Sequence, residues 1–469
     1  MRTLILIHRY LGISVGALMV LWCLSGAVMM YVGYPAVDER LRLQRLVPLD
    51  FDQCCTLPAD LPDTASVSEL QIENVAGSAR MHWRADRRSD PALPISRNEA
   101  AAVARPYAQG DARLASPELV ALDQWTVSGE FNADRPMYRF DLNDAGGSQL
   151  YVSGTTGRVV QLTTHSERVW NWFGAIPHWL YFSELRRRPS LWNWTVIVTS
   201  LAGTFLTAIG LWIGWAQWHH RPPGRPSPYR GLNLWHHIAG LVFGVLAFTW
   251  IVSGLLSMNP AGLLQGSGMQ SERQRLLGKP MTAGEMRTAL RGLAAARPAK
   301  IVAVRLTPLA GAAFFELTRP DGTRERVDVN GRTAPLSQRE LSYIGEALAG
   351  SAEVPPTRLT REDAYYFQHH RSLAQLPVYR LIAPRTEVHY YVDPMTGSLL
   401  SKFDAGAKGY RWWQQGLHRL DFAAALRERP LWDGLMLLAL SGVTLICVTG
   451  TWLGIRRLRA TFGSRATRA

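Results

Sequence analysis

The chain has 469 residues, of which 51 are Lys or Arg and 37 are Asp or Glu, so its formal net charge is +14. The length excludes a single small domain, and the 19% share of charged residues lies below the roughly 25% of a typical soluble domain. The charge by itself would suit a protein that binds nucleic acid or an anionic membrane surface. The mean hydropathy of −0.05 is that of an ordinary soluble protein, but it averages two very different kinds of segment.

Four long stretches contain no Asp, Glu, Lys or Arg: residues 10–37, 189–220, 231–271 and 434–455. About 20 apolar residues in a helix cross the roughly 30 Å hydrocarbon core of a bilayer. Each stretch therefore predicts a membrane-spanning helix rather than a buried core helix. The first stretch could instead be a signal peptide, but its apolar region is too long for one and no cleavage site is convincing.

Three short segments carry arginine without any acidic residue: two arginines at the N-terminus, three in the linker 219–232 and five in the tail 456–469. The positive-inside rule places these segments in the cytoplasm. The two long polar segments then face the other side of the membrane, which we expect to be a bacterial periplasm. The ten arginines of these segments are thus explained by the orientation of the chain in an inner membrane. Nucleic acid is therefore not expected as a partner.

The expected order along the chain is a helix (1–34), an external domain (35–190), a second helix (191–218), the cytoplasmic linker (219–232), a third helix (233–258), a second external domain (259–430), a fourth helix (431–455) and the cytoplasmic tail (456–469). Both external domains alternate strand-like segments with glycine-containing turns and helical stretches. This pattern predicts two small α+β domains on a bundle of four transmembrane helices.

The two halves of the chain resemble each other, which indicates a tandem duplication. Residues 7–26 match residues 235–254 at an offset of 228, and residues 177–193 match residues 417–433 at an offset of 240. A signal peptide cannot lie at the second copy, so the first copy is also expected to stay in the membrane. Both halves start in the cytoplasm, so the repeat is parallel and its pseudo-twofold axis should run along the membrane normal.

Two pairs of the twelve histidines follow the duplication. His8 and His236 start the first and third helices at the cytoplasmic side, whereas His178 and His418 precede the second and fourth helices at the external side. Two histidines related by a twofold axis could bind one metal centre from opposite faces, and haem accepts two axial imidazoles between helices. An interfacial histidine can also simply anchor a helix among lipid headgroups.

Small residues accompany the first histidine pair. Gly12 and Gly16 form a Gly-x-x-x-Gly motif, and Gly240 and Gly244 repeat it in the second half. Such motifs leave a helix face without side chains, which admits either a flat macrocycle or, more commonly, a closely packed helix.

Other residues that could bind a metal rank lower. Three histidines near the cytoplasmic face have no histidine at the repeated position: His219, His220 and His237. His369 and His370 form an external pair that could bind substrate or metal, or could be ordinary surface residues.

The four cysteines include an adjacent pair, Cys54 and Cys55, in a compartment expected to be oxidising. They could form a vicinal disulfide, pair with another chain or remain reduced. Adjacent Cα atoms lie ~3.8 Å apart, below the usual range for a disulfide, which disfavours an ordinary bridge. Cys23 and Cys447 fall within the expected membrane helices, where we expect them to be inert.

Several motifs occur in a characteristic order: HRYLG at 8–12, Ser25-Gly26, WNWFGAIPH at 170–178, Leu417-His418 and TGTW at 449–452, with strand-like segments at 135–160 and 376–400. In this order they resemble the PepSY-associated transmembrane family, iron-regulated inner-membrane proteins that include ferric-siderophore reductases. The resemblance covers nearly the whole chain. It departs from the family pattern after His418, where Arg-Leu-Asp replaces a small residue and Gly.

The resemblance implies two b-type haems, with His8, His236, His178 and His418 as the iron ligands, and PepSY-like external domains. It also implies outward electron transfer to a ferric siderophore or another ferric chelate. The electrons would come from quinol or from a cytoplasmic reductase, since no nucleotide-binding motif is present. Two alternatives stay open: a PepSY module that binds or regulates a periplasmic partner without being an enzyme, and a component of a siderophore or iron transporter.

Overall fold

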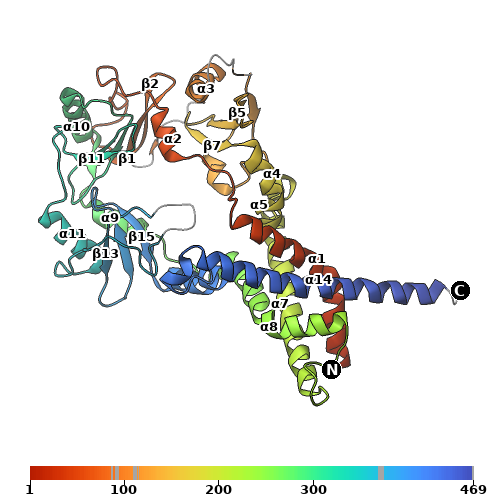
Figure 1. The fold of residues 1–469 in the computed structure, drawn as a ribbon. Helices are drawn as coiled ribbons and strands as arrows, with labels where there is room; N and C mark the ends of the chain where they lie inside the picture. The colour runs from red at the N-terminus through yellow and green to blue at the C-terminus, as the bar shows by residue number, and fades with distance from the viewer. Residues whose placement is uncertain (86–87, 90–93, 109–113, 115, 368–373, 467–469) are drawn as a thin grey trace. The chain divides into compact units, whose positions relative to one another are not determined.

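The computed structural model describes residues 1–85, 88–89, 94–108, 114, 116–367 and 374–466. The chain forms two compact units, which we describe separately (Figure 1). The helical unit contains Met1–Tyr34, Glu167–Gln265 and Gly406–Ala469, and the sheet unit contains Pro35–Ser166 and Gly266–Ala405.

Four long helices form the core of the helical unit: α1 (Arg2–Met29), α7 (Pro189–His219), α8 (Leu232–Ser257) and α14 (Leu431–Ala466). All four are long and apolar enough to cross a membrane. The shortest, α8, has 26 residues and at 1.5 Å per residue is about 39 Å long, which exceeds the roughly 30 Å hydrocarbon core. The predicted set of four candidate membrane helices is thus present, and α14 continues as a helix beyond residue 455.

The four helices pack in a ring in which each contacts two others: α1 contacts α7 and α14, and α8 contacts the same two. Glycines allow the close approaches. A Cβ atom added at Gly442 of α14 would lie 2.4 Å from the Phe243 ring of α8, so only glycine fits there. Buried apolar side chains from all four helices, among them Met19, Leu206 and Ala247, fill the space between them.

Short helices precede α7 and α14. Before α7 lie α4 (His165–Phe173), α5 (Ala175–Trp179) and α6 (Ser183–Arg186). Before α14 lie α12 (Ala405–Gly409), a π-helical segment at Tyr410–Gly416, α13 (Leu417–Arg419) and a 3₁₀ turn at Ala424–Arg427. Both α5 and α13 end at a leucine in the left-handed conformation, Leu180 with φ 52° and Leu420 with φ 54°.

The sheet unit contains two small antiparallel sheets with the same strand order. One comprises β4 (Glu118–Val120), β5 (Met137–Asp141), β6 (Gln149–Ser153) and β7 (Val159–Thr163); the other comprises β12 (Thr357–Leu359), β13 (Val378–Ile382), β14 (His389–Val392) and β15 (Leu399–Phe403). Their registers also agree, because Arg139 faces Tyr151 in the first sheet and Arg380 faces Tyr391 in the second.

A third sheet joins strands from both polar segments. Its order is β11 (Arg324–Val327), β10 (Phe315–Thr318), β9 (Ala303–Leu306), β1 (Ser66–Val75), β2 (Ser78–Ala85) and β3 (Arg88–Ser89), and β8 (Met281–Thr282) also pairs with β1. The pairing of β1 with β9 sets Ile72 opposite Val304. The sequence suggested two separate external domains, whereas the two segments share this sheet.

Helices cover the sheets of this unit. They are α2 (Glu39–Gln44), α3 (Arg97–Ala104), α9 (Gln270–Leu277), α10 (Ala283–Ala296) and α11 (Gln338–Ala349). The apolar face of α10, with Met286 and Leu290, packs in one core with Leu70 and Ile72 of β1. That core therefore also contains residues from both polar segments.

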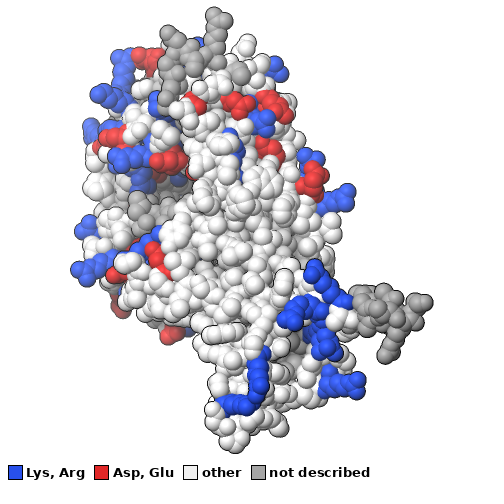
Figure 2. Space-filling model, turned by 45° about the vertical axis from the view of Figure 1, so that its right-hand side comes forward, with Lys and Arg blue, Asp and Glu red and all other residues white. Residues whose placement is uncertain are grey.

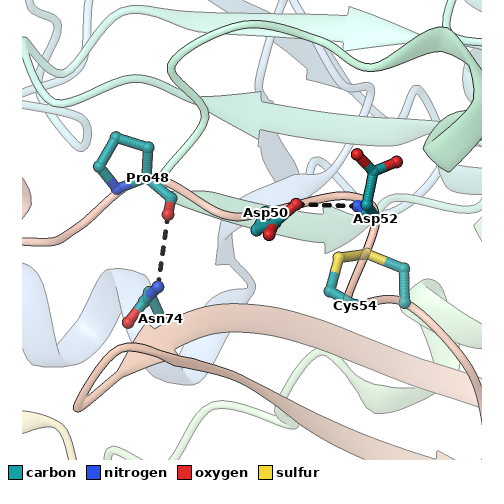
Figure 3. Close-up of a disulfide and its surroundings, with 6 residues drawn as sticks. Pro48, Asp50, Asp52, Cys54 and Asn74 are labelled. Atoms are coloured by element: carbon teal, nitrogen blue, oxygen red, sulfur yellow. Dashed lines mark hydrogen bonds between the residues drawn. A yellow bond between two sulfur atoms is a disulfide. The ribbon is translucent and has the colours of Figure 1, made fainter.

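Cys54 and Cys55 are joined as a vicinal disulfide (Figure 3). Cys55 is buried in the core beneath the seven-stranded sheet, and Cys54 packs against that core. In the same loop the backbone N–H of Asp52 donates to the Asp50 carboxylate at 3.0 Å. Of the three alternatives for this pair, the structure has the bridge between neighbours.

A buried ion pair lies on β1. The Glu73 carboxylate accepts from Arg42 Nη1 at 3.0 Å and lies 3.2 Å from Arg158 Nε. Burial alone would raise the pKa of Glu73, but the charges of Arg158 and Arg42 and hydrogen bonds from Arg42 and Gln71 outweigh it and lower that pKa. Ionised Glu73 therefore stabilises the folded sheet unit.

We expect Glu73→Gln to destabilise the protein by ~3 kcal/mol at neutral pH, because it leaves the buried Arg42 without one of its partners. Since the folded-state pKa lies below the unfolded value of about 4.3, this contribution is present above that value and is lost as the pH falls through the folded-state pKa. Thermal melting at a series of pH values tests this: the difference between wild type and variant should shrink on acidification.

The matched control is Glu39→Gln. Glu39 contacts the same arginine at 2.7 Å, but its side chain is 60% exposed, so its loss should cost less than about 1 kcal/mol. Equal effects of the two substitutions, or a difference that persists in acid, would contradict this account of the pair.

Candidate functional site

The two histidine pairs predicted from the repeat each come together in the helical unit. The rings of His8 on α1 and His236 on α8 have their centroids 6.3 Å apart. The rings of His178 on α5 and His418 on α13 have their centroids 6.1 Å apart. We call these the inner pair and the outer pair.

Backbone carbonyls orient the inner pair. His8 Nδ1 lies 3.0 Å from the carbonyl oxygen of Leu206, and His236 Nδ1 lies 3.2 Å from that of Ile446. A carbonyl oxygen only accepts, so each Nδ1 must carry the hydrogen. His236 Nδ1 also lies 3.0 Å from Thr449 Oγ1, whose own hydrogen goes to a carbonyl of α14. Both rings thus have a protonated Nδ1 and, when neutral, a lone pair at Nε2.

Serine hydroxyls orient the outer pair. His178 Nδ1 lies 3.2 Å from Ser25 Oγ and 3.1 Å from the Trp22 carbonyl oxygen, and His418 Nδ1 lies 3.0 Å from Ser253 Oγ. Each serine donates its own hydrogen to a carbonyl of its helix. The serine oxygens therefore accept from the imidazoles, and these rings too present Nε2.

Burial keeps the outer imidazoles neutral. Helices α5 and α13 lie outside the four long helices, and desolvation lowers the pKa of His178 to about 4. Desolvation, with help from the charge of Arg419, lowers the pKa of His418 to about 3. A neutral imidazole is the form that binds a metal.

The spacing within each pair suits a metal between the rings. A metal–imidazole bond is ~2.0–2.1 Å long, so two nitrogens on opposite sides of one metal place the ring centres roughly 6 Å apart. Within the described residues, no group of three or more His, Cys, Asp or Glu side chains could hold a metal ion. Each pair offers two imidazole ligands, whereas structural zinc sites typically have four protein ligands.

A cavity of about 690 Å³ lies beside the inner pair. This volume is within the roughly 300–1,000 Å³ of ordinary cofactor and ligand sites. Each of the four long helices contributes two glycines to its wall: Gly12, Gly16, Gly210, Gly214, Gly240, Gly244, Gly450 and Gly454. Nearly all of the lining residues form pairs that the offsets of 228 and 240 relate, so the wall follows the duplication.

Two of these glycines lie directly under the histidine rings. A Cβ at Gly210 would lie 2.6 Å from His8 Cε1, and a Cβ at Gly450 would lie 2.9 Å from His236 Cε1. Both contacts are too close for a carbon atom. These glycines therefore let α7 and α14 approach the rings closely enough for their carbonyls to accept from Nδ1.

Two other glycines have room beside them for a side chain. A Cβ at Gly240 would meet no atom of the described residues within 4 Å, and one at Gly12 would have Leu206 Cδ1 as its neighbour, at 3.8 Å. Each lies one helical turn after a histidine of the inner pair. In the same cavity wall, Thr451 Oγ1 is buried without a hydrogen-bond partner among the described residues. The free space and the lone pairs fit a flat, mainly apolar group.

The surroundings of the outer pair also contain unsatisfied groups. The indole N–H groups of Trp22 and Trp250 are buried and have no hydrogen-bond partner in the described part of the chain. They occupy positions related by the offset of 228, three residues before Ser25 and Ser253. The sequence paired these tryptophans and serines across the repeat without assigning them to a site. Their position beside the histidines emerges only in the fold.

The remaining predicted histidines are placed differently. His237 lines the inner cavity, but its Nδ1 lies 2.9 Å from Ser227 Oγ and its Nε2 lies 2.9 Å from the Gly214 carbonyl oxygen, so both nitrogens are engaged. The Nδ1 atoms of His219 and His220 lie near carbonyl oxygens one turn earlier in α7. His369 and His370 lie outside the described residues.

Comparison with known proteins adds no assignment: the chain matches no model of a protein family and none of the curated proteins.

Proposed function

We propose that the protein transfers electrons across a bacterial inner membrane through two b-type haems and reduces ferric chelates, such as ferric siderophores, on the outer side. The inner haem would be held by His8 and His236, and the outer haem by His178 and His418. The observation that carries the proposal is the spacing of 6.3 and 6.1 Å within the two pairs, each with Nδ1 held by an acceptor and Nε2 left to a metal.

The internal correspondences support a tandem repeat with a pseudo-twofold axis. The carbonyls that accept from the inner pair belong to Leu206 and Ile446, which are related by the offset of 240. In the sheet unit, the Tyr151 hydroxyl donates to Asp123 at 2.7 Å, and at the repeated positions the Tyr391 hydroxyl donates to Asp363 at 2.7 Å. We propose that the two modules containing these contacts are the PepSY-like domains.

The inner pair and the serine partners of the outer pair lie near opposite ends of α1 and α8. On α1, Ser25 of the outer site lies nearly five helical turns after His8, and on α8 Ser253 lies equally far after His236. At 1.5 Å per residue this separation is about 25 Å, which nearly spans the roughly 30 Å hydrocarbon core. With one redox group at each end of the helices, an electron would cross the membrane in two shorter transfers.

Haem, when bound, supplies one-electron redox chemistry at its iron. The residues of this chain perform the other tasks. The histidines would provide the nitrogen ligands, and the carbonyl and hydroxyl acceptors would fix the tautomer and increase the basicity of each imidazole. The apolar walls of the four helices would exclude water from the haem. The protein would thereby set the range of the haem's reduction potential.

The proposed orientation follows from charge. The N-terminus, the linker after α7 and the end of α14 carry arginines without acidic neighbours, and the positive-inside rule assigns them to the cytoplasm. The inner pair is near this side, so quinol or a cytoplasmic reductase would deliver electrons there. The acceptor would be a ferric chelate, because oxygen ligands that suit Fe(III) hold the reduced Fe(II) less firmly.

The test uses the purified full-length protein in nanodiscs. The protein is reduced with dithionite, freed of excess reductant and mixed anaerobically with a ferric hydroxamate chelate and a colorimetric Fe(II) trap. We expect the haem α-band to return to its oxidised form while about one Fe(II) appears per haem oxidised. A haem protein that stays reduced and forms no Fe(II) would refute the proposed acceptor class.

A further inference from the structure

The cavity beside the inner pair is symmetric in its glycines and in His8 and His236, but not in its charge. Among the described residues, the charged side chains other than histidine that line it are Arg9 of α1 and Arg456 and Arg457 of α14, and none is acidic. The position that repeats Arg9 is His237, whose two ring nitrogens are engaged by Ser227 and Gly214. The positive charge of the arginines thus lies on the α1 and α14 side alone.

These arginines lie at one end of the cavity. Arg9 follows His8 directly, and Arg456 and Arg457 follow Gly454 near the end of the apolar part of α14. The rest of the wall is apolar or glycine apart from a few neutral polar groups. At the lower end of the helical unit, the visible face shows Lys and Arg side chains without Asp or Glu beside them (Figure 2). The cavity therefore suits a ligand with an apolar body and an anionic edge.

We propose that Arg9, Arg456 and Arg457 bind the carboxylates of the inner haem and place its polar edge on the α1 and α14 side. This inference rests on the proposed function, because it concerns the same site. A guanidinium binds a carboxylate through two parallel hydrogen bonds, which are short and directional. Among the charged groups that line the cavity, the arginines distinguish one side from the other.

The charge of the arginines also acts on the iron. Positive charge nearby favours Fe(II) over Fe(III), because the reduced centre carries one positive charge fewer. The arginines should therefore raise the midpoint potential of the inner haem. That would make this haem a better acceptor for an electron arriving from the cytoplasmic side.

The test compares two ligands in the His178→Ala background, which leaves only the inner site. Full-length apoprotein is titrated with haem b and with its dimethyl ester, in which both carboxylates are blocked. We expect the ester to bind roughly tenfold more weakly or worse, as hydrogen bonds to charged groups require. The triple variant Arg9→Gln, Arg456→Gln, Arg457→Gln should lose this discrimination and show a lower midpoint potential.

The control is Arg459→Gln, which removes an arginine of the same helix that does not line the cavity, and it should leave both readouts nearly unchanged. If haem b and its ester bind the parent protein equally well, or the triple variant keeps its potential, the arginines do not bind the carboxylates and this inference fails while the haem site stands. If the parent protein binds neither ligand, the proposed function itself fails. The comparison of haem b with its ester uses a protein in which all three arginines are intact. It therefore still tests the inference if the triple variant misfolds.

Discussion

We expect His8→Ala to reduce the haem content from about two per chain to about one and to abolish electron transfer across the membrane. His8 is one of the two ligands proposed for the inner haem, with its ring centroid 6.3 Å from that of His236, and alanine has no nitrogen to replace it. Ser25, which contacts His178 of the outer pair, lies about 25 Å away along α1, so the outer haem should remain. Haem content per chain and the dithionite difference spectrum measure the change.

His178→Ala should produce the converse result, with loss of the outer haem and retention of the inner one. His220→Ala is the matched control, because His220 lies at the inner end of α7 and its Nδ1 lies against a carbonyl of its own helix. Retention of both haems in either ligand variant would show that the pairing is wrong. Loss of both haems together from a correctly folded variant would show that the sites are not independent.

Gly240→Leu should prevent binding of the inner haem without unfolding the protein. A Cβ at Gly240 meets no atom of the described residues within 4 Å, so the leucine would enter the open part of the cavity one turn after His236. The folded state loses no contact, and leucine is a better helix former than glycine by up to about 1 kcal/mol. We therefore expect about one haem per chain and a melting temperature of the haem-free protein that is unchanged or higher.

Gly434→Leu serves as the control, since a Cβ at Gly434 of α14 also has no described neighbour within 4 Å but this residue does not line the cavity. This variant should keep both haems. Gly210→Leu is expected to behave differently from Gly240→Leu, because it would displace His8 from its place against α7. A full haem complement in Gly240→Leu would mean that the open face of α8 does not adjoin the ligand.

The four long helices and the two histidine pairs were predictable because each leaves a strong trace in the sequence. A long uncharged, apolar stretch has few structural solutions, and a duplicated chain reveals which residues recur. His8 and His236 could be paired from the sequence alone because they share the offset of 228. The same comparison placed Ser25 with Ser253, but not their role as acceptors for the outer imidazoles.

Other features could not be predicted, for physical reasons. Every residue has a carbonyl, so nothing in the sequence marks those of Leu206 and Ile446 as the acceptors for the inner pair. The shared sheet was also hidden, since alternation identifies a buried strand face but not the strand that pairs with it. Likewise, Gly210 and Gly240 look alike in the sequence, although one lies under a ring and the other faces open space.

A pyridine haemochrome assay on the purified full-length protein tests the central claim most directly, because it reports both the type and the number of haems. The account predicts haem b at about two per chain, together with a Soret and α-band shift on reduction by dithionite. A folded protein that is colourless, and that stays so after incubation with haem, would contradict it.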